Sequence, residues 1–230
     1  ALSYNCQRCT ALKIFYVERR IADAFADALT TAVGRLPAGM PWEQGVKLTP
    51  LPEDGKGAWL SSLVEDAVAK GARVLNPSGG ERAGTYFHPA VLYPVSPAMK
   101  IHDEEQFGPI VPIMPFDRDE EVVDLITRSP YGQQASIFGR DGARVAALVD
   151  ALAAQVSRIN LNSQCQRGPD AFPFTGRKAS AEGTLSVGDA LRVFSIRAMV
   201  AAKDDPDNRA LLSDILRERR SSFLSTDFLF

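Results

Sequence analysis

The order of the predicted strands and helices constrains the fold of this chain more than any other feature. Apolar runs rich in β-branched and aromatic residues, typical of buried strands, alternate with segments whose apolar residues recur every three or four positions, as in helices. Strands that alternate with helices of about ten to fifteen residues indicate an α/β fold with a parallel sheet. The predicted strands are 12–18, 108–116, 134–140 and 157–162, and the predicted helices are 19–37, 59–72, 118–130 and 142–155.

Two of these elements carry more detailed predictions. The prolines of the strand over 108–116 indicate an edge position or an irregular start, because proline cannot donate to a strand ladder. The helix over 19–37 is expected to end at Gly34 and to turn one apolar face toward the core. That face consists of Ile21, Phe25, Leu29 and Val33.

The C-terminal part departs from the alternation. Residues 189–202 form a β-rich run with no helix to pair it, which predicts a strand that reaches away from the α/β block. A charged linker and a predicted helix over 208–220 follow. We therefore expect an α/β domain over 1–183, a strand segment over 184–203 and a tail over 204–230. An apolar cluster at the end of the tail is expected to dock on another surface; it consists of Phe223, Leu224, Phe228, Leu229 and Phe230.

Composition excludes several classes of partner. The 230 residues carry a formal net charge of −2, which argues against nucleic acid, since phosphate binding needs a concentrated basic face. No apolar run approaches the roughly 18 residues of a membrane span. The three cysteines have no framework spacing, which favours a reduced, cytoplasmic protein. An organelle is the alternative if a targeting segment has been removed.

The first ten residues hold the strongest candidate nucleophile. Cys9 is flanked by Arg8 and Thr10, and a cation or a backbone nest near a thiol lowers its pKa. The alternative is that Cys9 is a small buried hydrophobe, as free cysteines often are. Cys6 and Cys9 together form a C-x-x-C pair, which could act as a redox switch. A zinc site is not expected, because the remaining candidate ligands have no paired spacing; they are Cys165, His88 and His102.

Two loops add further polar candidates. "DEEQFGP" over 103–109 sets three carboxylates before an aromatic residue and a rigid Gly-Pro turn, which suits a loop that accepts hydrogen bonds from sugar hydroxyls. The long loop over 165–180 places Arg167 before a second Gly-Pro, where a guanidinium could hold an anion with two hydrogen bonds. Each of these signals alone is weak, and an ordinary charged surface loop is the alternative.

Taken in order, these motifs resemble the C-terminal half of an aldehyde dehydrogenase. "NCQRCTA" stands where that family has its G-Q-x-C nucleophile motif, "EEQFGP" matches its E-x-F-G-P loop, and "PFTGRKAS" matches its P-F-G-G-x-K-x-S. "ALRVFSIRAMV" is similar to its terminal oligomerisation strand. The likeness covers about residues 1–203. Within the family, "SYNCQRCTALK" and "RGPDAFPF" resemble the non-phosphorylating, NADP-dependent glyceraldehyde-3-phosphate dehydrogenases.

The resemblance implies a role for each motif residue, with NADP as the cofactor and NAD as the alternative. Cys9 would attack the aldehyde to give a thiohemiacetal and then carry a thioester, and the backbone around Cys9 and Thr10 would form part of the oxyanion site. The other implied roles are ribose binding by Glu105, packing near the nicotinamide by Phe107, and binding of the substrate phosphate by Arg8 and Arg167.

The chain also departs from the family pattern. Cys6 stands where the family has a glycine, and its side chain is expected to crowd the nucleophile loop. The cofactor-binding part, the general base and the oxyanion asparagine of the family all precede the nucleophile motif. We therefore expect an N-terminal half, as a separate chain or a removed segment, in a homo- or hetero-oligomer. The alternative is a non-catalytic structural or assembly subunit of a larger complex.

Overall fold

The computed structural model describes residues 1–196 and 198–224. The chain divides into two compact units, Ala1–Ser186 and Val187–Phe230, and each is considered by itself. Within the described residues, no helix is both long and apolar enough to cross a membrane.

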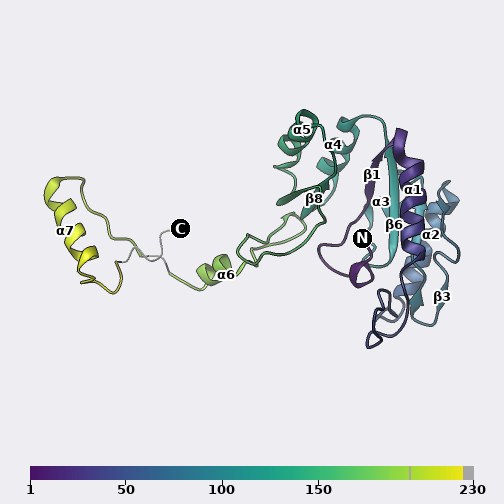
Figure 1. The fold of residues 1–230 in the computed structure, drawn as a ribbon, viewed down its shortest axis with the longest axis horizontal. Coiled ribbons are helices and arrows are strands. Elements are labelled where there is room, and N and C mark those ends of the chain that lie inside the picture. Colours follow the sequence, from purple (N-terminus) through teal and green to yellow (C-terminus); the bar gives the residue numbers. More distant parts are fainter. Residues whose placement is uncertain (197, 225–230) are drawn as a thin grey trace. The chain divides into compact units, whose positions relative to one another are not determined.

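A four-stranded sheet is the centre of the first unit. Its strand order is β1 (Phe15–Glu18), β6 (Ile110–Phe116), β5 (Ala90–Tyr93) and β2 (Arg73–Val74). β1 and β6 lie side by side in Figure 1. β1 and β5 both run parallel to β6, whereas β2 pairs with β5 in the antiparallel sense. The predicted α/β fold with a parallel sheet is confirmed.

A separate parallel pair of strands follows in the same unit. β8 (Gln134–Ile137) pairs with β9 (Arg158–Leu161) in register from Gln134–Arg158 onward. The helices α4 (Asp119–Arg128) and α5 (Gly142–Leu152) pack against each other beside this pair. Each of these elements lies within its predicted range.

Two helices cover opposite faces of the main sheet. α1 (Arg19–Gly34) shares a core with Val91 and Val111, whereas α2 (Lys56–Ala69) shares a core with Leu92 and Ile110. Neighbouring residues of a strand point to opposite faces, so these two clusters lie on either side of the sheet.

The buried face of α1 differs from the prediction. Ala22 and Ala26 are fully buried against the sheet, because small side chains allow a helix to approach it closely. Ile21 is 52% exposed, and with Phe25 it lines a cavity beside β1 instead. Only Val33 of the predicted face is buried, and the helix ends at Gly34 as predicted.

The expected edge position of β6 is wrong, because β6 lies between β1 and β5. Its prolines sit where the ladders stop. The Ile113 oxygen accepts a hydrogen bond from the Val95 N–H, so the backbone groups of Ile113 and Pro115 point toward β5. The pairing of β6 with β5 ends at Pro112, before Pro115 is reached. The backbone groups of Pro112 point toward β1, and the pairing of β6 with β1 starts only at Ile113 of β6. Neither proline therefore interrupts a ladder bond.

Shorter elements complete the first unit. β3 and β4 form a small antiparallel hairpin, and β10 pairs with β7. The bounds are η1 Ser3–Cys6, β3 Arg82–Ala83, β4 Tyr86–Phe87, α3 Lys100–Asp103, β7 Tyr131–Gly132 and β10 Arg177–Lys178.

The second unit contains two helices, α6 (Val187–Val193) and α7 (Pro206–Arg217). The strand expected over 189–202 is wrong for the described residues, which form α6 and then irregular chain. A lone strand leaves its backbone groups unpaired, and this unit offers no second strand in its described part. The predicted helix over 208–220 is confirmed, with Asp205 capping it by accepting from Asn208 N–H at 2.9 Å. Of the apolar tail, Phe228, Leu229 and Phe230 lie outside the described residues.

Candidate active site

The loop that carries the candidate nucleophile begins with a strained left-handed turn. Tyr4, Asn5 and Cys6 have φ values of 53°, 55° and 60°. Such angles cost most residues about 1–2 kcal/mol each, although asparagine tolerates them better. The turn is fixed by Asn5, whose Nδ2 donates to the Thr49 oxygen at 3.0 Å and to Thr49 Oγ1 at 2.9 Å. The Thr49 N–H in turn donates to Asn5 Oδ1 at 3.0 Å.

Cys6 occupies one of these left-handed positions, which explains why the family pattern has glycine there. Its side chain is only 2% exposed and its Sγ lies 3.7 Å from the Leu12 oxygen. Burial raises the pKa of Cys6 to about 11. At neutral pH Cys6 is therefore a protonated, poorly reactive thiol.

Cys9 lies in the next turn and is exposed. The turn is closed by the Ala11 N–H, which donates to the Arg8 oxygen at 2.9 Å. The N–H groups of Cys9 and Thr10 inside this turn donate no hydrogen bond to any described residue. An accessible thiol beside two free backbone donors can attack a carbonyl carbon and stabilise the oxyanion that forms.

The "EEQFGP" loop is joined to the nucleophile segment by Gln106. This side chain is 1% exposed, and its Nε2 donates to the Lys13 oxygen at 2.9 Å and to the Ile110 oxygen at 3.2 Å. Lys13 Nζ donates in the reverse direction, to the Ile101 oxygen. Hydrogen bonds in both directions therefore join the "EEQFGP" loop and its neighbourhood to the segment around Lys13.

Phe107 has an unusual backbone conformation, with φ at 37°. A bulky residue at positive φ is a true outlier, and such strain concentrates at functional sites. The next residue, Gly108, packs directly against α2, where a Cβ would lie 2.6 Å from Leu60 Cδ1. This contact explains the glycine of the motif and fixes the loop against the helix.

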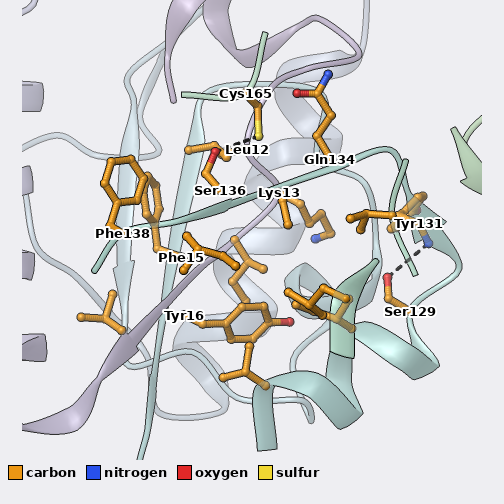
Figure 2. Close-up of a pocket in the computed structure, with 18 of the residues that line it drawn as sticks. Leu12, Lys13, Phe15, Tyr16, Ser129, Tyr131, Gln134, Ser136, Phe138 and Cys165 are labelled. Atoms are coloured by element: carbon orange, nitrogen blue, oxygen red, sulfur yellow. Dashed lines mark hydrogen bonds between the residues drawn. The ribbon is translucent and has the colours of Figure 1, made fainter. Parts of the chain in front are cut away.

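Most of the candidate residues lie around one cavity of about 810 Å³, and Figure 2 labels other residues of its lining. In Figure 2, Lys13 and Tyr16 from the segment of β1 approach it from one side, and Gln134 and Ser136 of β8 approach it from another. The sequence-predicted residues that line it are Cys6, Arg8, Cys9, Thr10, Glu105 and Phe107.

Arg167 is the one predicted site residue that does not line this cavity. Its guanidinium lies 3.8 Å from Asp170 and over the Phe174 ring at 5.7 Å. Arg8 reaches toward the same loop, because its Nη2 lies 3.5 Å from the Cys165 oxygen. The two arginines therefore approach one loop without converging on a shared point.

Lys13 is an electrostatic outlier of the cavity wall. Burial lowers the pKa of Lys13 to about 8, and the charges of Asp103 and Glu105 oppose this shift. A lysine whose pKa is lowered toward physiological pH is typical of functional sites as well as of buried structural positions.

Sequence reasoning missed Asn5, Gln106 and Lys13 as residues that build the site. Asn5 could have been found, since asparagine is a frequent residue at positive φ and stands beside the nucleophile motif. Nothing in the sequence distinguishes Gln106 or Lys13 from surface residues, because their roles depend on contacts between segments about ninety positions apart.

Comparison with known proteins identifies the family of this chain. The aldehyde dehydrogenase family matches residues 1–200. The NADP-dependent glyceraldehyde-3-phosphate dehydrogenase of Streptococcus equinus is 33% identical over 203 residues, which are 88% of this chain and 40% of that protein.

Two solved aldehyde dehydrogenase structures are also similar to this chain. The Bacillus halodurans C-125 NADP-dependent glyceraldehyde-3-phosphate dehydrogenase, complexed with NADP, is 37% identical with a TM-score of 0.78, over 83% of this chain and 39% of that one. The Burkholderia pseudomallei succinate-semialdehyde dehydrogenase is 33% identical with a TM-score of 0.77, over the same shares. This chain spans about two fifths of the length of the relatives it matches, and it belongs to the aldehyde dehydrogenase family.

Proposed function

We propose that this chain is the nucleophile-bearing part of an NADP-dependent aldehyde dehydrogenase that oxidises glyceraldehyde 3-phosphate to 3-phosphoglycerate. The observation that carries the proposal is the exposed thiol of Cys9. It lies in a turn with two free N–H donors and lines the same cavity as Glu105 and Phe107. The similarity to two glyceraldehyde-3-phosphate dehydrogenases supports the choice of substrate.

The proposed chemistry begins at Cys9. Its Sγ attacks the aldehyde carbon, and the N–H groups of Cys9 and Thr10 stabilise the resulting oxyanion. Loss of a hydride from the former aldehyde carbon of this thiohemiacetal leaves a thioester on Cys9, and water then hydrolyses the thioester to the carboxylic acid and the free thiol. The base that activates this water is expected in the N-terminal half of the enzyme, together with the asparagine that completes the oxyanion site.

The residues present fit the nicotinamide end of NADP. Glu105 is exposed on the cavity wall, where its carboxylate can accept hydrogen bonds from ribose hydroxyls. Phe107 lines the same cavity and can pack against a flat ring. When bound, NADP accepts the hydride that leaves the substrate. The remainder of its binding site is expected in the N-terminal half.

The phosphate of the substrate is assigned to Arg8 and Arg167. Arg8 contacts the Cys165 oxygen at the start of the loop that begins at Cys165, and Arg167 belongs to that loop. A guanidinium suits a phosphate because it offers two parallel donors. Arg167 is 59% exposed and its contact with Asp170 is long, so it is free to turn toward a ligand.

A structural or assembly subunit is the second candidate. The observation that favours it is a group of exposed apolar side chains in the second unit, which would be costly unless another surface covers them. They are Phe194, Ile196, Met199 and Phe223.

The test is reconstitution. The chain would be co-expressed with the part of the S. equinus enzyme that lies outside the match, and NADPH formation from glyceraldehyde 3-phosphate would be followed by absorbance. We expect Cys9→Ala to reduce turnover by at least about a thousandfold, since the nucleophile is lost. Cys165→Ala is the matched control, because Cys165 is a buried thiol of the same cavity.

Two results would count against the proposal. Near-normal turnover of Cys9→Ala would remove Cys9 as the nucleophile. A stable complex of the two polypeptides that oxidises no aldehyde, with Cys9 still reactive toward maleimide, would favour the structural subunit.

A further inference from the structure

Lys13 is a cation without an ion pair in the wall of the cavity. Its side chain is half-buried, and Figure 2 draws it among the residues that line the 810 Å³ cavity. Within the described part of the chain, its ammonium group pairs with no carboxylate. Lysines are rarely buried without a partner, because burial removes the water that solvates the charge. The chemistry proposed for Cys9 gives this side chain no role.

The amine of Lys13 makes a single hydrogen bond. Its Nζ donates to the Ile101 oxygen, and no other acceptor of the described residues takes a hydrogen from it. A neutral amine retains two N–H hydrogens, so Lys13 can keep this bond after it loses a proton. The lone pair that the proton leaves behind is a nucleophile.

Lys178 has the opposite arrangement of contacts. Its Nζ donates to three main-chain oxygens, those of Ile126 at 2.7 Å, Thr127 at 3.1 Å and Ser129 at 3.0 Å. All three hydrogens of the ammonium group are used, so loss of a proton would break one of these bonds. Burial lowers the pKa of Lys178 as well, but each bond is stronger when the donor is charged. Although Lys178 is more exposed than Lys13, its contacts therefore favour the unreactive ammonium form.

The electrostatic environment of Lys13 favours the free amine. Burial lowers the pKa of Lys13 to about 8, although the nearby charges of Asp103, Glu104 and Glu105 oppose this shift. Cys6 is also close, but burial raises the pKa of its thiol to about 11, so it is uncharged at neutral pH. At pH 7.5 about a quarter of Lys13 is free amine, against roughly one part in a thousand for an ordinary lysine.

The charges near Lys13 also indicate which ligands it can accept. Asp103, Glu104 and Glu105 follow Ile101 directly in the chain, and their carboxylates repel an anion that approaches the amine. An uncharged molecule meets no such barrier. The lining of the cavity is otherwise rich in apolar side chains, which suits a small uncharged molecule; among them are Phe15, Val122 and Ile126.

We propose that Lys13 is a carbonyl-reactive amine, which binds small uncharged aldehydes in this cavity as an imine. The nitrogen lone pair adds to the aldehyde carbon, and the proton that the nitrogen gives up passes to the aldehyde oxygen, forming a carbinolamine. Loss of one water molecule then leaves a C=N bond. The step needs no oxidant, and water reverses it. The protonated imine keeps one N–H, which can still donate to the Ile101 oxygen.

The consequence is a reversible block of the cavity that Cys9 also lines. An aldehyde bound at Lys13 occupies space in the cavity without being oxidised. The inference rests on the contacts of Lys13 and does not depend on the catalytic role of Cys9.

Reductive trapping in the full chain tests the proposal. The chain is incubated at pH 7.5 with glyceraldehyde and sodium cyanoborohydride, without NADP, and peptide mass mapping locates the reduced adducts. Lys13 should be labelled at least about tenfold faster than Lys47, an exposed lysine, and than Lys178. Equal labelling of Lys13 and Lys47 would overturn the proposal.

Two variants separate this proposal from the catalytic one. Lys13→Arg retains a charged donor for Ile101 but cannot form an imine, so it should lose the fast adduct while Lys47 is labelled as before. Cys9→Ala should keep the Lys13 adduct, and its loss in that variant would overturn the proposal. Labelling of Lys13 in a reconstituted enzyme that oxidises no aldehyde would leave this inference standing and remove the catalytic one.

The pH dependence gives an independent measurement. The ratio of Lys13 to Lys47 labelling within one sample should be constant in acid and fall above about pH 8, because Lys13 is then mostly free amine while Lys47 is still losing its proton. A ratio that stays constant up to pH 10 would mean that Lys13 titrates like an ordinary lysine, and it would overturn the proposal.

A phosphorylated aldehyde tests the choice of ligand. Measured against Lys47 in the same sample, glyceraldehyde 3-phosphate should label Lys13 at least about threefold more slowly than glyceraldehyde, because of the three carboxylates. Equal or faster labelling by the phosphorylated aldehyde would overturn the assignment to an uncharged ligand.

Discussion

The side-chain nitrogen of Gln106 lies 2.9 Å from the main-chain oxygen of Lys13, four residues after Cys9. This bond joins the loop that carries Glu105 and Phe107 to the segment that carries the nucleophile. Gln106 is fully enclosed, so its contacts are made in a low-dielectric environment where an unpaired partner is costly. The Gln106 amide therefore helps to fix the relative position of the two parts of the site, together with the bond from Lys13 to the Ile101 oxygen.

We predict that Gln106→Leu lowers the free energy of unfolding by about 2–4 kcal/mol, because it leaves the buried oxygens of Lys13 and Ile110 without their donor. Urea unfolding followed by circular dichroism measures the change. Gln155→Leu is the matched control, since the Gln155 side chain makes no hydrogen bond to the described residues, and it should stay within about 0.5 kcal/mol. If both variants lose the same free energy of unfolding, the Gln106 side chain does not link the two segments.

The sequence predicts the elements of the first unit well because they are local. Periodicity and turn residues lie within each segment, so β8, β9, α4 and α5 all fall within their predicted ranges. The link through Gln106 could not be predicted, since it depends on how two distant segments pack.

The wrong prediction over 189–202 has a different cause. β propensity measures how well side chains fit a pleated, paired surface, and a strand needs a partner. Within the described part of the second unit no partner strand exists, and the local i,i+3 pair of Asp189 and Arg192 stabilises α6 instead. Composition alone could not reveal this absence.

The three thiols are predicted to react in a fixed order. Cys9 is exposed, whereas Cys6 and Cys165 are 2% and 5% exposed and burial raises the pKa of both. At pH 7.5 we expect maleimide to modify Cys9 at least about a hundredfold faster than the other two, as shown by peptide mass mapping. The Cys6–Cys9 disulfide stays a prediction. Cys6 reacting as fast as Cys9 would show that the nucleophile loop opens, which would favour the redox pair.

The lowered pKa of Lys13 predicts that the stability of the chain rises with pH in the alkaline range. The pKa of Lys13 is about 8 in the folded chain and about 10.4 in the unfolded chain. As the pH rises, the folded chain therefore loses the Lys13 proton at a lower pH than the unfolded chain. Between these values the unfolded state binds more protons, and rising pH therefore favours folding. The stability of wild type relative to Lys13→Met should increase by about 1–3 kcal/mol from pH 7.5 to pH 10.

Urea titrations of both proteins at the two pH values measure this difference, and contributions from Cys6 largely cancel because both proteins retain it. Lys47→Met controls for the loss of an exposed lysine. A difference between wild type and Lys13→Met that does not change with pH would mean that Lys13 is well solvated in the folded chain.

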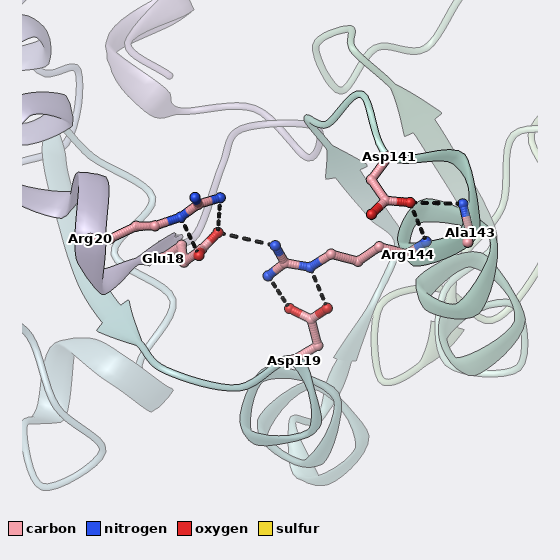
Figure 3. A network of polar contacts seen from close by, with 6 residues as sticks. All are labelled: Glu18, Arg20, Asp119, Asp141, Ala143 and Arg144. Atoms are coloured by element: carbon pink, nitrogen blue, oxygen red, sulfur yellow. Dashed lines mark hydrogen bonds and ion pairs between the residues drawn. The ribbon is translucent and has the colours of Figure 1, made fainter.

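Arg144 is predicted to fix α5 against α4 and the end of β1. Its Nε and Nη2 donate to the two oxygens of Asp119 at 2.6 Å, and its Nη1 donates to Glu18 at 3.0 Å (Figure 3). Asp119 and Glu18 in turn hold the pKa of Arg144 above its ordinary value. Because the guanidinium is partly exposed, solvent screens the network, and Arg144→Met should cost about 1 kcal/mol at pH 7.

The contribution of Arg144 should disappear in acid. Hydrogen bonds from Arg144 hold the pKa of Asp119 below its ordinary value, so the stabilisation is present above about pH 4 and is lost as the pH falls through the folded-state pKa. Arg118→Met is the control, because Arg118 pairs with Glu121 on the exposed surface of α4 and should cost less than about 0.5 kcal/mol. If the two variants lose equal stability at pH 7, the bidentate contact between Arg144 and Asp119 does not hold the helices together. If Arg144→Met instead loses more and the loss persists unchanged at pH 3, the side chain acts by packing and its charge is not required.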